Sequence, residues 1–185
     1  MRLTKQSLVR RWLLTTVLAA LVFAVLYGLD FELKGLSDYS TQDLQRFSTA
    51  GEYQLAFQAW APLYMRRVHF NLGLDYLLML LYAMAFFYSG ILAREAFAPR
   101  PGRLRRILTM LAAVPLAAAI LDAIENALEF ALVSNDPSGP LAQIAFGVSS
   151  AKWPAFYVGV ALWLGALFGR QLERQKRRLK AANGP

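Results

Sequence analysis

The residues most able to do chemistry in this chain are four polar side chains that lie within eight positions of one another, namely Asp122, Glu125, Asn126 and Glu129. Their spacing of i, i+3, i+4 and i+7 places all four on one face of a helix. Carboxylates and a carboxamide on one face can bind a cation, exchange a proton or accept hydrogen bonds from an amine. Because the surrounding segment 107–133 is otherwise almost entirely apolar, we expect this face to point into a helix bundle or a hydrated cavity.

A single base, Lys152, lies in the next apolar segment, 141–169. The intervening residues 134–140 are rich in Pro, Gly, Ser, Asn and Asp, which predicts a tight turn between two antiparallel helices. Asp122 and Lys152 each lie eleven residues from their end of this turn, which places both about 17 Å below the same surface. An isolated charge at that depth costs about 2.5–3.5 kcal/mol, so we predict that the two residues form an ion pair.

A third segment, 70–93, contributes polar residues near its start. These are Asn71 and Asp75, and Arg67 lies four residues before Asn71. Asp75 lies about 8 Å inside the surface, near the level expected for Glu125 and Glu129. Lys152 alone cannot neutralise Asp75, Asp122, Glu125 and Glu129. Some of these acids must therefore be hydrated, protonated, or matched by Arg67 or by a ligand.

The elements that position these residues are four apolar runs, each close to or above the about 20 residues that a membrane-spanning helix needs. They cover residues 12–29, 70–93, 107–133 and 141–169. The runs are continuous and lack the alternation of a membrane β-strand. We therefore predict an all-α polytopic membrane protein with four transmembrane helices, forming a single domain over residues 1–185. The first helix carries no comparable polar group and is expected to pack at the periphery.

The long connection 30–69 is predicted to lie outside the membrane and to contain a short amphipathic helix over Thr49–Met65. Tyr53, Phe57, Trp60 and Tyr64 recur there at spacings of four, three and four. The favoured interpretation is a helix at the membrane interface, where Trp and Tyr are enriched. A lid over an opening between the helices is the alternative. Pro62 is expected to bend this helix toward the second span.

The composition excludes several kinds of functional site. The chain is 57% hydrophobic and contains no cysteine and one histidine. Disulfide scaffolds, thiol catalysts, cysteine zinc sites and iron–sulfur clusters are therefore excluded. No P-loop or glycine-rich nucleotide loop is present in the sequence. We expect neither a metal nor a cofactor, and His69 is interpreted as an interfacial residue.

The formal net charge of +8 is explained by topology rather than by nucleic-acid binding. Fifteen of the 20 basic residues lie before residue 12, between residues 94 and 106, or in the tail 170–185. These three stretches fall on one side of the predicted membrane, and basic residues are enriched on the cytoplasmic side. We predict a multi-pass protein of the cell inner membrane with both termini cytoplasmic. The basic tail would contact anionic lipids of the bilayer, and no nucleic-acid partner is expected.

The segment Leu121-Asp-Ala-Ile-Glu-Asn-Ala-Leu128, followed by a stretch of small residues and Lys152 in the next helix, resembles a pattern in an uncharacterised family of small bacterial four-helix inner-membrane proteins. The resemblance covers the last two spans. It implies a membrane location and draws attention to Asp122, Glu125, Asn126 and Lys152. Because the family has no assigned activity, the resemblance implies no mechanism.

Three functional hypotheses follow from the sequence. The leading one is a buried acidic site that opens externally and binds a cation, a proton or an amine-bearing small molecule, with Asp122 paired to Lys152. The second is an enzyme that modifies a lipid or isoprenoid, with a carboxylate as acid or base and with Trp153, Phe156 and Tyr157 stabilising positive charge. The third is an assembly subunit whose polar network is purely structural and which binds a protein partner or a second copy of itself.

Overall fold

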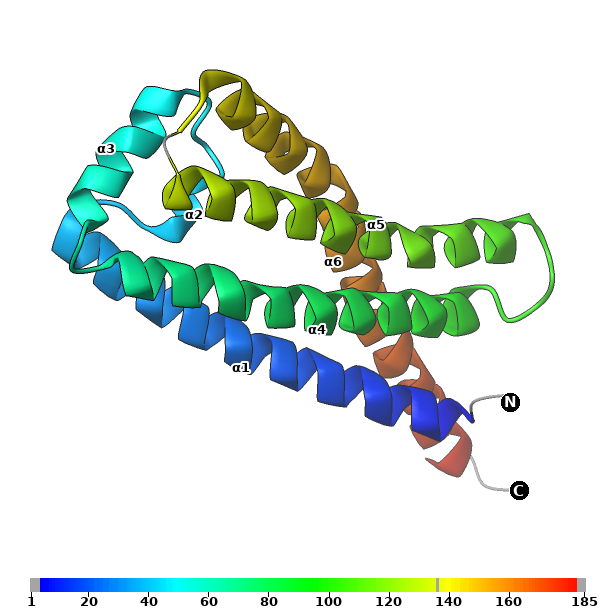
Figure 1. Ribbon diagram of the computed structural model, residues 1–185. Coiled ribbons are helices and arrows are strands. Elements are labelled where there is room, and N and C mark those ends of the chain that lie inside the picture. The colour runs from blue at the N-terminus through cyan, green and yellow to red at the C-terminus, as the bar shows by residue number, and fades with distance from the viewer. Residues whose placement is uncertain (1–3, 136, 183–185) are drawn as a thin grey trace.

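The computed structural model describes residues 4–135 and 137–182 (Figure 1), and every regular element within these ranges is helical. Four of the helices are long and apolar enough to cross a membrane. In chain order the elements are α1 (Lys5–Ser37), α2 (Thr41–Leu44), α3 (Ala50–Trp60), α4 (Met65–Phe97), α5 (Arg103–Ser134) and α6 (Gly139–Ala182). The all-α architecture predicted from the apolar runs is confirmed.

The other three long helices, α1, α5 and α6, all pack against α4, and α5 also packs along α6. α4 accordingly buries a larger share of its apolar span than the other three long helices. Both ends of the described chain lie at the same end of the bundle (Figure 1), and α2 and α3 lie at the other end. Large apolar side chains such as Leu21, Met110 and Ile120 are exposed on the outer helix faces. Exposed apolar surface of this kind is compatible with an integral membrane protein.

Close approach between α4 and its neighbours is possible because small residues lie at the crossings. A Cβ atom added at Gly90 in α4 would lie 2.5 Å from the Cβ of Ala112 in α5. One added at Gly159 in α6 would overlap the ring of Phe86 in α4. Small residues at helix crossings are the usual way in which apolar helices gain packing contact in a membrane.

The helices extend beyond the predicted spans. α1 continues to Ser37 and α4 begins at Met65, so the predicted external connection of residues 30–69 shortens to residues 38–64. The extensions are stabilised by packing, since Leu33 in α1 and Val68 in α4 are both buried. α6 likewise continues through the basic segment to Ala182, where Gln, Glu, Arg, Lys and Leu all favour helix.

α3 is shorter than the predicted helix over Thr49–Met65. It begins after a capping box in which Thr49 and Glu52 satisfy each other's backbone N–H groups, and it ends at Trp60. Ala61 is extended, the conformation that a following proline favours. Pro62 therefore follows the end of the helix, and the prediction that it bends the helix was wrong.

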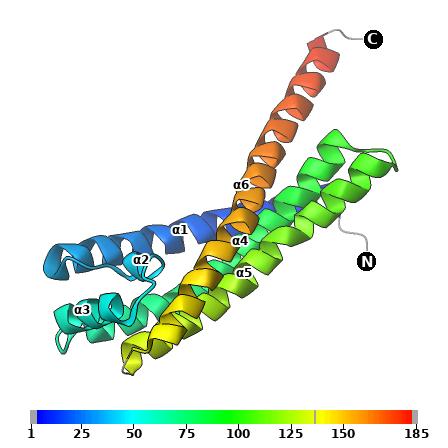
Figure 2. The ribbon, with the colours of Figure 1, turned by 90° about the horizontal axis from the view of Figure 1, so that it is seen from above.

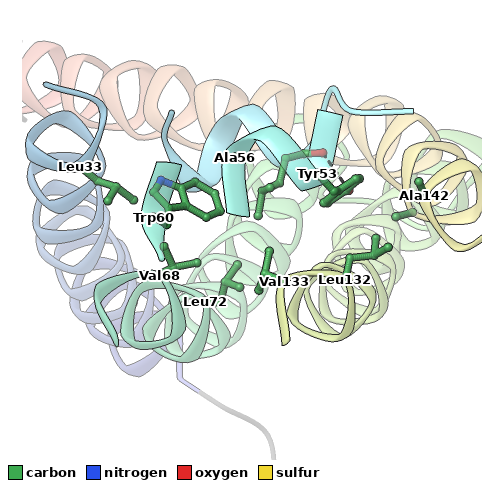
Figure 3. Packing of buried hydrophobic residues seen from close by; sticks show 11 residues of the cluster. Leu33, Tyr53, Ala56, Trp60, Val68, Leu72, Leu132, Val133 and Ala142 are labelled. Carbon is green, nitrogen blue, oxygen red and sulfur yellow. Dashed lines mark hydrogen bonds between the residues drawn. The ribbon is translucent and has the colours of Figure 1, made fainter. Parts of the chain in front are cut away.

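The aromatic face of α3 packs into the protein (Figure 3), so the interfacial interpretation is wrong for Tyr53 and Trp60. Both side chains are buried in a cluster with Leu33, Val68 and Val133. The Trp60 indole N–H donates to Ser37 Oγ at 3.0 Å, and the Tyr53 hydroxyl donates to the Leu44 carbonyl oxygen at 3.1 Å. α3 thus packs against the end of the bundle.

Candidate functional site

The polar interior is organised around Lys152 in α6. Its Nζ lies 2.7 Å from Oδ1 of Asp122 and 2.5 Å from Oε2 of Glu125, both in α5. Lys152 is only 5% exposed. The ion pair predicted from equal depth in the α5–α6 hairpin is therefore present, and Glu125 is a second partner that the depth argument had not singled out.

α4 joins this ion pair through a tyrosine. The hydroxyl of Tyr82 donates to Oδ2 of Asp122 at 2.8 Å, so both oxygens of this carboxylate are bound by α4 and α6. One turn further along α5, Asn126 donates from Nδ2 to the backbone oxygen of Leu72 in α4 at 2.6 Å. The helix face predicted from the sequence spacing therefore points into the bundle and holds α4, α5 and α6 together.

A second polar group centres on Asp30 near the end of α1. Its Oδ1 accepts hydrogen bonds from the Thr41 N–H at 3.0 Å, from the Thr41 hydroxyl at 2.6 Å and from Nδ2 of Asn71 at 2.6 Å. This corrects the expectation that the first helix carries no comparable polar group, because α1 extends beyond residue 29 and includes Asp30. A signal was available, because Asp30 directly follows the apolar run at the depth of Asn71.

Arg67 does not reach the buried acids. It pairs with Glu32 of α1 at 2.6 Å, and both side chains are about half exposed. The prediction that Arg67 helps to neutralise the interior is wrong, because the extension of α1 places Glu32 beside it. His69 lies elsewhere, with its ring 4.8 Å from that of Phe130 and its Nε2 3.2 Å from Ser134 Oγ.

The site contains more hydrogen-bond acceptors than donors. Four buried oxygens in it accept no hydrogen bond from the part of the chain that the structure describes, and they are Asn71 Oδ1, Glu125 Oε1, Asn126 Oδ1 and Glu129 Oε1. Glu129 is only 3% exposed. Buried acceptors of this kind are uncommon in proteins, and each calls for a donor.

Asn71 and Glu129 line a cavity of about 610 Å³ between α1, α4, α5 and α6, a volume typical of sites for small organic molecules. Its polar wall is formed by Asp30, Asn71, Asp75, Asp122, Glu129 and Lys152. Asp75 lies on this wall as predicted from its spacing to Asn71. α2 contributes Thr41 and Gln42 at one end of the cavity, and aromatic residues of α1 and α6 line its sides.

Two carboxylates outside the long helices stabilise α2 and the start of α3 at this end of the bundle. Asp43 of α2 accepts from the Ser40 N–H at 2.8 Å and lies 3.1 Å from Lys34 Nζ. Partial burial raises the pKa of Asp43, but the hydrogen bonds from Ser40 and the charge of Lys34 bring it below its ordinary value. Hydrogen bonds from Ser48 and Thr49 similarly lower the pKa of Glu52 at the start of α3.

Within residues 4–135 and 137–182, no group of three or more His, Cys, Asp or Glu side chains is placed to hold a metal ion. No family model, curated protein or solved structure matches the chain. The resemblance to a family of four-helix inner-membrane proteins therefore stays a prediction, and the argument for function rests on the cavity.

Proposed function

We propose that this chain is an integral membrane protein whose cavity binds the protonated amine of a small molecule. The observation that supports this most strongly is the set of buried acceptors that receive no hydrogen bond from the described residues, above all Glu129 Oε1 and Asn71 Oδ1 on the cavity wall. An ammonium group supplies what these oxygens need, since it carries three N–H donors and no acceptor.

The charge of the cavity favours the same ligand. Asp30, Asp75, Asp122 and Glu129 line it. Of the two basic residues in its lining, Lys152 is bound to Asp122 and Glu125, and Arg46 is exposed beside α2. A buried carboxylate without a counter-ion is costly, so a cation in the cavity would stabilise the acids that Lys152 does not reach. A quaternary ammonium has no N–H donor, and no group of three or more His, Cys, Asp or Glu side chains among the described residues is placed to hold a metal ion.

Aromatic rings beside Lys152 provide a second contribution. The rings of Tyr82 and Phe156 pack edge to face with their centres 5.4 Å apart, and Lys152 Nζ lies 5.5 Å from the centre of the Trp153 ring. Aromatic faces attract cations, and the attraction grows when water is excluded. The cavity therefore combines carboxylates and aromatic rings, as sites for organic amines do.

In the membrane we place both termini in the cytoplasm and α2 and α3 on the external side.

The proposal is tested by ligand-dependent thermal stability in lipid nanodiscs. We expect 2-phenylethylamine at neutral pH to raise the Tm of the protein, and its N-trimethyl analogue and 2-phenylethanol to raise it much less. Glu129→Gln should weaken the apparent affinity at least about tenfold, since a hydrogen bond to a charged group contributes about 1.5–3 kcal/mol.

The matched control is Glu32→Gln, which changes an acid that is about half exposed and lies outside the cavity. It should leave the amine-dependent rise in Tm unchanged. Equal stabilisation by the amine and the alcohol, or an identical response in the Glu129→Gln variant, would contradict the proposal.

A further inference from the structure

The two helices that border the cavity on either side, α1 and α6, make contact near one end of the bundle. There Lys5 pairs with Glu173, and the Arg170 guanidinium lies 5.1 Å from the centre of the Trp12 ring. From that end the two helices diverge, as Figures 1 and 2 both show, and α4 and α5 form the back wall between them. The cavity lies in the resulting wedge.

Each of the diverging helices carries a pair of aromatic residues one turn apart at the edge of the cavity. Phe23 and Tyr27 of α1 stack with their ring centres 6.2 Å apart, and Trp153 and Tyr157 of α6 are 5.8 Å apart. All four line the cavity, yet they are between 39% and 62% exposed. Residues that line a cavity and are also exposed mark an opening, and these four place one opening on the side of the bundle between α1 and α6.

At the end of the bundle axis α2 lies across the cavity, and Gln42 and Arg46 line the cavity there and are exposed. Thr41 of α2 is fastened to Asp30, and Asp43 is fastened to Lys34, so that α2 is tied to α1 across the end of the cavity. α3 packs beside it with Trp60 and Tyr53 buried. The side mouth lies within the apolar spans of α1 and α6, where the surroundings in a membrane are lipid chains.

From this geometry we infer that the cavity opens sideways into the bilayer between α1 and α6, and that its ligand is an amphiphilic amine. The protonated amino group reaches Glu129 and Asp75, and the hydrocarbon chain passes between the two aromatic pairs into the lipid. This inference rests on the proposed function and adds to it the route of entry and the apolar part of the ligand. Acidic side chains inside the cavity and aromatic rings at its mouth suit an amphiphilic amine better than a fully water-soluble one.

The route is tested by site-directed fluorescence, because the chain has no cysteine and single cysteines can be introduced for labelling. A bimane label at Tyr157→Cys in phosphatidylcholine nanodiscs should be quenched by doxyl-labelled lipid, and dodecylamine should relieve the quenching. The control label at Gln42→Cys on α2 should respond to aqueous iodide and not to doxyl lipid. Quenching of the Tyr157 label by iodide alone would overturn the lateral route.

The ligand class is tested by variants of the mouth. Phe23→Ala should weaken dodecylamine binding about threefold to tenfold, the range expected for loss of an aromatic contact, and should weaken 2-phenylethylamine binding less. Phe168→Ala is the control, since this exposed α6 residue does not line the cavity. The dodecylamine binding that remains in the Glu129→Gln variant measures non-specific partitioning of the long amine into the bilayer.

The outcomes separate the two proposals. If 2-phenylethylamine binds in a manner that depends on Glu129 while Phe23→Ala has no effect on dodecylamine, the inference about the mouth is wrong and the proposed function stands. If neither amine binds, both proposals are wrong. Binding of both amines with selective loss of the long one in Phe23→Ala supports both.

Discussion

Lys152 Nζ and Asp122 Oδ1 lie 2.7 Å apart across the α5–α6 hairpin, at positions equally distant from its turn. The same lysine also contacts Glu125, and Asp122 also accepts a hydrogen bond from Tyr82. The pair is thus the centre of a network that joins three of the long helices. Its partners are all buried or nearly so, and removing one of them leaves a charge in an apolar environment.

Exchanging the two charges tests whether the pair acts as a unit. We expect Asp122→Lys and Lys152→Asp each to destabilise the protein by about 3–5 kcal/mol, because each leaves buried charges unmatched. The double exchange should recover part of this loss, and a double-mutant cycle from unfolding in detergent measures the recovery. Strictly additive losses would show that the two residues do not stabilise each other. The exposed pair Arg67 and Glu32 serves as the control for exchange at a surface site.

The tyrosine that completes the network is tested by removing one atom. Tyr82→Phe deletes the hydroxyl that donates to Asp122 and keeps the ring against Phe156. We expect a loss of about 1.5–3 kcal/mol in the free energy of unfolding, typical of a hydrogen bond to a charged group. Tyr157→Phe, at a largely exposed tyrosine, should change stability by much less, and an equal loss in both variants would refute the role of the bond.

Asp30 is expected to hold α2 over the end of the cavity. Asp30→Ala leaves the Thr41 and Asn71 donors without their acceptor, which should destabilise the protein by about 1–3 kcal/mol. Hydrogen exchange at residues 41–44 should accelerate before the long helices are affected. The comparison variant Glu32→Ala removes a half-exposed ion pair and should have little effect. Unchanged exchange in Asp30→Ala would show that α2 is held by other contacts.

The cap formed by α2 and α3 should loosen in acid. Hydrogen bonds in the folded state hold the pKa values of Asp43 and Glu52 below their ordinary values. Their contribution to stability is therefore fully present above the unfolded-state pKa values of about 4 and is lost as the pH falls through the lower folded-state values. The hydrogen-exchange protection factors of residues 40–60 should fall in that window. Glu52→Gln should exchange faster at neutral pH and depend less on pH, and a response identical to that of the native chain would contradict this origin.

The long helices and the central ion pair were predictable because both follow from local rules. Continuous apolar runs identify the spans, the 3.6-residue period places Asp122, Glu125, Asn126 and Glu129 on one face, and a tight turn makes depth on one helix comparable with depth on the next. Asp122 and Lys152 could therefore be paired by counting residues. No knowledge of how α4 packs was needed for that step.

The remaining parts of the site depend on packing between segments far apart in the chain. Asp30 is buried because Thr41 folds back over it and Asn71 approaches from α4, and neither contact has a periodic signal in the sequence. Tyr53 and Trp60 have the spacing of an interfacial face, yet the ends of α1, α4 and α5 offer them a core. Arg67 pairs with Glu32, which lies within its reach because α1 continues beyond its apolar run.

The central claim is that a protonated amine donates to Glu129 inside the cavity, and solid-state NMR can measure this contact directly. Protein labelled with ¹³C at its glutamate carboxyl carbons would be bound to ¹⁵N-labelled 2-phenylethylamine in lipid. We predict a dipolar coupling that corresponds to a distance of about 3.5 Å between the amine nitrogen and a glutamate carboxyl carbon, as for a charge-assisted hydrogen bond, and its loss in Glu129→Gln. Bound amine with no such coupling, or a coupling that persists in Glu129→Gln, would contradict the claim.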